Sequence, residues 1–219
     1  MMKTGIIWDL DGTLLDTLGD LTDATNYALA QFGCPPRSLE HIRSIVGNGA
    51  LRQMTLALPG NADDPDPQAV LAVYKPYYQS HCALKTGPYP GILEALEILG
   101  REYPMAIITN KPHATASALC ARHFPGIFAL GETPEIPRKP APDMICHAMK
   151  ELGVERCICV GDSEVDLVTA GNAGAPCLTV LWGFRDREDL EKAGARWFCH
   201  KAEDLPAIIK SIIEVTYGQ

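Results

Sequence analysis

The sequence lacks the features that mark several classes of protein. None of its apolar runs approaches the roughly 18 residues that a membrane-spanning helix needs, and the start, Met1-Met2-Lys3-Thr4, leads into too few apolar residues for a signal-peptide core. It has no cluster of Lys and Arg, and its formal net charge is −8, which disfavours binding to a nucleic-acid backbone. We therefore expect a cytoplasmic protein whose partner is neither a membrane nor a nucleic acid.

Metal-site motifs built on Cys and His are also missing. The chain has eight cysteines, but no pair has the C-x-x-C spacing of a structural zinc site. Its six histidines include no H-E-x-x-H pattern. Cys157 and Cys159 lie two residues apart in an apolar run, where a buried thiol acts as a small hydrophobe. We expect the cysteines to be reduced and structural.

Carboxylates at the end of an apolar run dominate what is present. Residues 6–8, Ile-Ile-Trp, read as a buried strand, and Asp9 and Asp11 follow it directly before Gly12. Both carboxylates can then lie in the crevice beyond the strand's carboxyl end, where open α/β sheets bind ligands. Two like charges this close are costly unless a cation neutralises them or one carboxylate is protonated.

Three further motifs follow downstream. Residues 105–111 form an apolar run that ends in Thr109, Asn110 and a lysine. Lys139 lies just before a helix that begins with prolines. Residues 157–166 form a third apolar run, which ends in carboxylates four residues apart, Asp162 and Asp166. Each motif stands at the end of a predicted strand or at the start of a predicted helix.

The chain divides by its hydrophobic pattern. Residues 18–84 show only helical spacing, whereas helices and strands alternate from residue 85 onward, which is typical of a parallel sheet. The first strand belongs with the alternating part, so the helical block is inserted after it. We expect an α/β core of residues 1–16 and 85–219 and a helical cap of residues 17–84.

Some local details of the cap are also predicted. Asp16 or Thr17 can cap a first helix that runs to about Phe32, and Gly33 ends it. Pro76 lies inside a later helical pattern and predicts a kink or a break there.

The four motifs, in order and spacing, resemble those of the haloacid dehalogenase-like phosphohydrolase superfamily. The resemblance implies a Rossmann-like core with the first strand central and a helical-bundle cap. It also implies that Asp9 and Asp162 bind Mg²⁺ through their side chains and Asp11 through its backbone carbonyl. Asp166 lies one helical turn after Asp162. We expect it to contact the groups that bind the metal, or to bind the metal through a water molecule.

The residue types suit phosphoryl transfer. Oxygen ligands of this kind favour Mg²⁺, Lys139 can supply a compact positive charge, and Thr109 and the amide of Asn110 can donate hydrogen bonds. Asp9 would be the nucleophile that forms an aspartyl-phosphate, and Asp11 the general acid and then base. The dehalogenases of the superfamily lack an acid at the second position, so the presence of Asp11 favours phosphate esters.

Shorter stretches resemble the phosphoglycolate phosphatase branch. They are Ile45–Ala50, Tyr89–Gly91, Thr109–Pro112 and Leu181–Phe184. This implies a small phosphorylated metabolite as substrate, in a monomer or homodimer. A sugar phosphomutase of the same superfamily and a catalytically silent binding protein remain as alternatives.

The cap contains one candidate for substrate recognition. Gly47-Asn48-Gly49 is a turn with free backbone amides before a helix, and Arg52 follows one turn into that helix. Because Arg suits a carboxylate, we expect the cap turn and Arg52 to recognise a small anionic leaving group.

Overall fold

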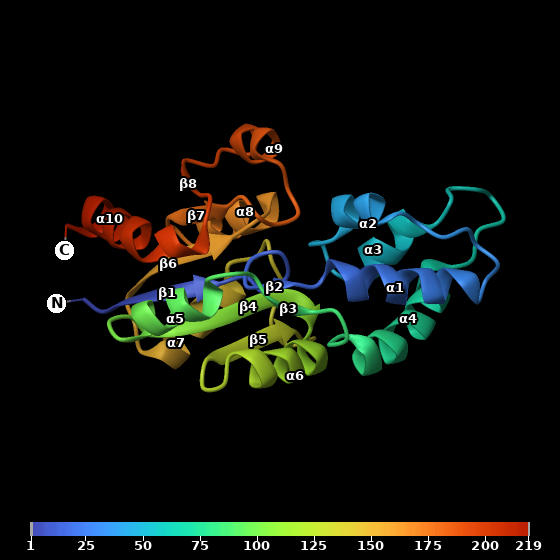
Figure 1. Cartoon of the computed structure of the whole chain (residues 1–219), viewed down its shortest axis with the longest axis horizontal. Coiled ribbons are helices and arrows are strands. Elements are labelled where there is room, and N and C mark those ends of the chain that lie inside the picture. Colours follow the sequence, from blue (N-terminus) through green and yellow to red (C-terminus); the bar gives the residue numbers. More distant parts are fainter. Residues whose placement is uncertain (1, 219) are drawn as a thin grey trace.

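A computed structural model describes residues 2–218. It is an α/β core beside a bundle of helices (Figure 1). Within residues 2–218, no helix is long and apolar enough to cross a membrane.

The core is built on one six-stranded sheet. Its spatial order is β5 (Phe128–Glu132), β4 (Met105–Pro112), β1 (Thr4–Trp8), β6 (Arg156–Gly161), β7 (Cys177–Val180) and β8 (Trp197–Cys199). Every neighbouring pair is parallel, as the alternating pattern predicts. The central place of the first strand, which the family resemblance implies, is confirmed. Since β4, β1 and β6 are adjacent, the motifs that follow them meet at one edge of the sheet.

Helices cover both faces of this sheet. Ile6 and Trp8 of β1 pack on the face covered by α5 (Ile92–Gly100), α6 (His113–His123) and α10 (Leu205–Tyr217). Ile7, which points the other way, packs on the face covered by α7 (Asp143–Leu152) and α8 (Glu164–Asn172). β1 is therefore buried on both sides, and this explains its unbroken apolar run.

Four helices follow β1 before the chain returns to the sheet. They are α1 (Leu18–Ala30), α2 (Leu39–Ile45), α3 (Ala50–Ala57) and α4 (Pro67–His81). They lie beyond the carboxyl ends of the strands (Figure 1). The chain leaves through β2 (Leu15–Asp16) and re-enters through β3 (Gly87–Pro88), and these two short strands pair antiparallel. We keep residues 17–84 as our proposed bounds of this cap.

A buried carboxylate holds the two connections together. Asp20 of α1 is 2% exposed and accepts hydrogen bonds from the backbone amides of Leu84, Lys85 and Thr86 at 3.0–3.1 Å. It also accepts one from the Thr86 hydroxyl at 2.8 Å. The start of the cap is thereby fixed to the segment that ends it.

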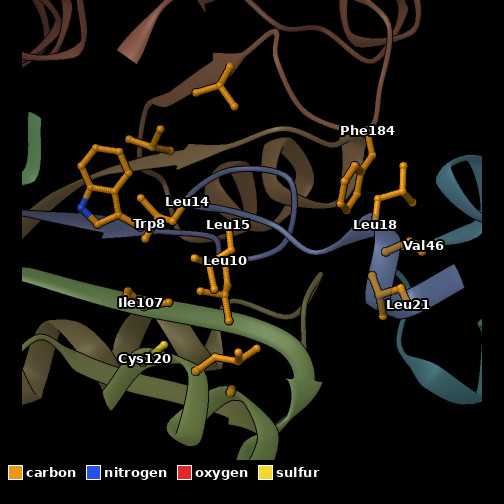
Figure 2. Close-up of a cluster of buried hydrophobic side chains, with 14 of the residues drawn as sticks. Trp8, Leu10, Leu14, Leu15, Leu18, Leu21, Val46, Ile107, Cys120 and Phe184 are labelled. Atoms are coloured by element: carbon orange, nitrogen blue, oxygen red, sulfur yellow. The ribbon is translucent and has the colours of Figure 1, made fainter. Parts of the chain in front are cut away.

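Core and cap share one hydrophobic cluster. Phe184, on the loop after β7, belongs to the same buried cluster as Leu18, Leu21 and Val46 of the cap, and Figure 2 shows all four on the side of the cap. Leu10 and Leu14 of the loop that follows β1, and Leu15 of β2, are buried in the same cluster (Figure 2). The cap is therefore packed down on the core.

Several local expectations need correction. α1 ends at Ala30 rather than at Phe32, because the chain already turns toward Gly33, whose φ is +69°. Of the kink or break predicted at Pro76, the break is wrong: α4 runs unbroken from Pro67 to His81, and Tyr74 and Tyr78 are buried on either side of the proline. The kink stays a prediction. The helix expected to begin with the prolines after Lys139 begins at Asp143, directly after Pro142.

The start of α1 agrees with the prediction in part, and two short elements were not predicted. Of the two expected caps of α1, Asp16 accepts a hydrogen bond from the amide of Leu18, while Thr17 makes no side-chain cap. Two short elements, α9 (Arg187–Lys192) and a 3₁₀ turn at Ala202–Asp204, were not predicted, because so few residues give no clear periodicity.

Candidate active site

A small cavity lies where the strand ends of the core meet the cap. Its volume is about 50 Å³, room for only a few water-sized groups. Its charged lining residues all come from the core: Asp9, Asp11, Lys111, Lys139, Asp162 and Arg185. The cap contributes uncharged residues, among them Gly47, Gly49, Gln53, Tyr74 and Tyr78.

Lys139 links two of the carboxylates. Its buried Nζ lies 2.6 Å from Asp9 Oδ1 and 2.6 Å from Asp166 Oδ1. Burial by itself would lower the pKa of Lys139, but Asp166 and Asp9 outweigh it and raise that pKa above its usual value. The ammonium therefore stays charged beside Asp9.

One lysine does not neutralise the acidic cluster. Asp9, Asp162 and Asp166 each place a carboxylate oxygen within 4.8 Å of the others. Burial raises the pKa of Asp9 to about 7, with Asp166 and Asp11 acting in the same direction. Burial and the charges of Asp9 and Asp166 raise the pKa of Asp162 as well, although the amide of Phe184 donates a 2.6 Å hydrogen bond to its carboxylate and acts in the opposite direction. Such a set of buried, closely spaced carboxylate oxygens fits a hard divalent cation such as Mg²⁺.

Asp166 has structural contacts of its own. Its Oδ2 accepts hydrogen bonds from the Ser163 hydroxyl at 2.6 Å and the Ser163 amide at 3.2 Å, which caps the start of α8. Its Oδ1 contacts Lys139. The structure thus places Asp166 where it orients the lysine.

Three glycines make room for these carboxylates. A Cβ on Gly12 or on Gly183 would collide with the carboxylate of Asp162, and one on Gly161 would collide with that of Asp166. Gly12 also has φ +83°, which disfavours other residues. The glycine in the first motif is therefore needed both for its backbone conformation and for the approach of Asp162.

Thr109 and Asn110 line the cavity from the end of β4. The Thr109 hydroxyl is buried and accepts a 3.2 Å hydrogen bond from the amide of Lys111, which leaves its own proton to donate. The side-chain amide of Asn110 donates to the carbonyls of Gly47 and Lys139, at 3.1 and 3.0 Å. Asn110 therefore ties the cap turn to the core.

Lys111 is a site residue that sequence reasoning missed. Its Nζ lies 2.8 Å from Asp11 Oδ1 and donates a 2.7 Å hydrogen bond to the hydroxyl of Tyr78 on α4. Its side chain is only 2% exposed. The available signal was its place in the same motif, directly after Thr109 and Asn110 at the carboxyl end of β4, where all three residues line the cavity.

The cap turn lies at the cavity, but not in the way expected. Gly47 and Gly49 line the cavity with φ values of +115° and +82°, whereas Asn48 is half-buried and outside the lining. Arg52 is exposed on α3 and is not among the lining residues. The structure therefore does not bring Arg52 to the site.

Core arginines contact the cap turn instead. The Arg185 guanidinium donates to the carbonyls of Val46 at 2.7 Å and Arg43 at 3.0 Å, and pairs with Glu164 at 2.9 Å. The Arg138 guanidinium occupies the space that a Cβ on Gly49 would need. The turn thus serves as a docking point between cap and core.

Comparison with known proteins gives consistent results. Residues 3–174 match the family model described as haloacid dehalogenase-like hydrolase. The chain is 34% identical over 218 residues to a phosphoglycolate phosphatase of Rhodobacter capsulatus, covering 95% of this chain and 98% of that one. It is 35% identical over 192 residues to phosphoglycolate phosphatase 1 of Pseudomonas aeruginosa, covering 82% and 70%.

Solved structures share the fold over nearly the whole chain. A crystal structure of a protein from Lactobacillus delbrueckii subsp. bulgaricus superposes with a TM-score of 0.86 at 39% identity, covering 95% of this chain and 99% of that one. A haloacid dehalogenase-like family hydrolase from Streptococcus pneumoniae gives 0.84 at 26% identity, covering 94% and 98%. The chain belongs to the haloacid dehalogenase-like hydrolases, on their phosphoglycolate phosphatase-like branch.

Proposed function

We propose that the protein is a Mg²⁺-dependent phosphatase that hydrolyses a small, phosphoglycolate-like monoester through an aspartyl-phosphate. The observation that carries the proposal is the pairing of Asp9 with Lys139 at 2.6 Å, at the end of the central strand and inside a small cavity that also contains Asp11. The relatives named phosphoglycolate phosphatase support the choice of substrate.

The metal would be held by the side chains of Asp9 and Asp162 and by the backbone carbonyl of Asp11. When bound, it offsets the negative charge that the phosphoryl group and the carboxylates bring together. Asp9, Asp162 and Asp166 are buried together, and within residues 2–218 Lys139 is the only cation that forms an ion pair with any of them, which supports this assignment.

The chain's own residues then carry the reaction. An oxygen of Asp9 attacks phosphorus and the bond to the ester oxygen breaks, while Asp11 gives its proton to the leaving alkoxide. Asp11 next takes a proton from a water whose oxygen attacks phosphorus, which releases inorganic phosphate and restores Asp9. Lys139 holds Asp9 in place, and the Thr109 hydroxyl can donate to a phosphoryl oxygen.

Phosphate release from 2-phosphoglycolate by the purified protein tests this function. We expect turnover with Mg²⁺, none in excess chelator, and a labelled Asp9 when the reaction is quenched early with labelled substrate. Isomerisation of a sugar phosphate with little phosphate release would instead indicate a mutase. No turnover of any monoester would indicate a binding protein.

A further inference from the structure

We propose that Lys111 of β4 is the residue that recognises a carboxylate on the leaving group of the substrate. The inference deepens the proposed function and rests on it. Lys111 thereby takes the role that the sequence predicts for Arg52, which lies outside the cavity.

The position of Lys111 follows from the role of Asp11. Asp11 can protonate the leaving oxygen only if that oxygen lies within hydrogen-bond distance of its carboxyl group. The ammonium of Lys111 is 2.8 Å from the same carboxyl group. It therefore lies beside the atoms attached to the leaving oxygen, whereas Lys139 lies beside Asp9 and the phosphoryl side.

The strand supports this division of labour. Thr109, Asn110 and Lys111 follow one another at the carboxyl end of β4, where its pairing with β5 is irregular, and all three line the cavity. Thr109 is suited to the phosphoryl group, and Lys111 is suited to the group joined to it. Contacts to the phosphoryl group and to the leaving group thus come from one strand end.

Lys111 also has the capacity for another partner. The other lining cations are engaged: Lys139 by two carboxylates, and Arg185 by Glu164 and two backbone carbonyls. An ammonium has three N–H groups. The Tyr78 hydroxyl accepts one of those on Lys111, and Asp11 Oδ1 lies beside the ammonium as an ion pair at 2.8 Å.

Tyr78 adds a donor to the same place. Burial raises the pKa of Tyr78 well above its usual value, so its hydroxyl keeps a proton while it accepts from Lys111. Lysine N–H and tyrosine O–H together match the two oxygens of a carboxylate. Because both side chains are buried, such charge-assisted hydrogen bonds are strong.

A pair of substrates of nearly equal size tests the proposal. The probes are 2-phosphoglycolate, which carries a carboxylate, and 2-hydroxyethyl phosphate, which has a CH₂OH group in its place. For Lys111→Met we expect the ratio of kcat/KM for the anionic over the neutral substrate to fall about 10- to 100-fold, the range for one charge-assisted contact. Lys111→Arg should restore part of the ratio. Lys75→Met, an exposed lysine on the helix that carries Tyr78, is the matched control and should leave the ratio as it is.

Binding provides a second readout that does not need turnover. Calorimetry should show that Lys111→Met weakens the binding of 3-phosphonopropionate but hardly changes the binding of 3-hydroxypropylphosphonate. If both substrates lose activity equally, Lys111 only positions Asp11, and the proposal is overturned. An unchanged ratio overturns it too. A failure of the proposed function is distinct from both, because the wild-type protein would then hydrolyse neither ester.

Discussion

The core and the cap contribute different chemistry to the same cavity. Among the described lining residues, each charged side chain lies on the core, and the cap supplies glycines, tyrosines, one glutamine and apolar groups. The core residues stand at the ends of adjacent parallel strands, while the cap hangs on the paired strands β2 and β3. The charged groups of the site are therefore concentrated on the sheet of the core.

This division has a physical reason. A charge carried by a hinged element has to lose its water shell each time the element closes, and that desolvation is expensive. A charge fixed at a strand end is already placed, and only neutral groups must approach it. At the cavity the cap presents only uncharged groups and the carbonyls of Val46 and Gly47, which avoids most of this cost. The ion pair between Arg43 of the cap and Asp186 of the core lies at the exposed edge.

The strongest test of the core is Asp9→Asn. If Asp9 is the nucleophile that we propose, loss of its carboxylate should lower turnover at least about 10⁴-fold, as in other enzymes that lose a nucleophile. Steady-state phosphate release measures it, with circular dichroism as the check on folding. Appreciable turnover in a homogeneous preparation would rule out the covalent route.

Asp11→Asn should have the next largest effect on activity. Removing a general acid and base slows the chemical step by about 10² to 10⁴. The loss should be smallest for aryl phosphates, whose leaving groups need little protonation. Comparison of an aryl with an alkyl phosphate measures this, and an equal loss for both would contradict the assigned role.

The junction between cap and core is tested by Asp20→Ala. Three backbone amides and one hydroxyl would lose their buried acceptor, so the free energy of unfolding should fall by about 3 kcal/mol. Urea denaturation measures it. Asp23→Ala is the control, since Asp23 makes only a half-exposed ion pair with Lys85 and should cost under about 0.5 kcal/mol. Similar losses in both variants would refute the special role of Asp20.

The acidic cluster predicts a pH dependence for the metal-free protein. Burial raises the pKa of Asp9 to about 7, from 3.8 for a free side chain, so the folded state holds a proton that the unfolded state releases. This contribution to stability is present at low pH and is lost as the pH rises through about 7. Mg²⁺ should therefore raise the Tm more at about pH 8 than at about pH 5.5. An equal gain at both values would contradict a metal site at Asp9.

The smallest effect is expected on the exposed face of the cap. Arg52→Ala should change kcat/KM for 2-phosphoglycolate less than about twofold, because exposed charges outside a site contribute little. Steady-state kinetics of Arg52→Ala and Lys111→Met, measured together, compares the two losses in kcat/KM. A larger loss in Arg52→Ala than in Lys111→Met would mean that the cap, and not β4, recognises the anionic group.

Much of the core could be predicted because its signals are local. The apolar run of β1 and the carboxylates after it are adjacent in sequence, and strand–helix alternation predicts a parallel sheet whose ends meet at one edge. Asp9, Asp11, Thr109, Lys139 and Asp162 all line the one cavity as a result.

The cap could not be predicted to the same depth. Helical spacing shows that a helix follows Gly49, but not which side of it faces the core. Gln53 is buried at the cavity while Arg52, its neighbour, is exposed, because adjacent helical residues point about 100° apart. Only the packing of α3 against α4 and the core decides between them.

The sequence by itself determined the chemistry of this protein, since residue types at strand ends dictate which groups can attack, donate and bind a cation. The tertiary structure alone decided which positive charge stands beside Asp11. Lys111 of β4 pairs with Asp11 and donates to the hydroxyl of Tyr78 on α4, and these residues, far apart in the chain, meet only when the cap packs on the core. Side-chain partners across such an interface depend on three-dimensional packing, which no local pattern encodes.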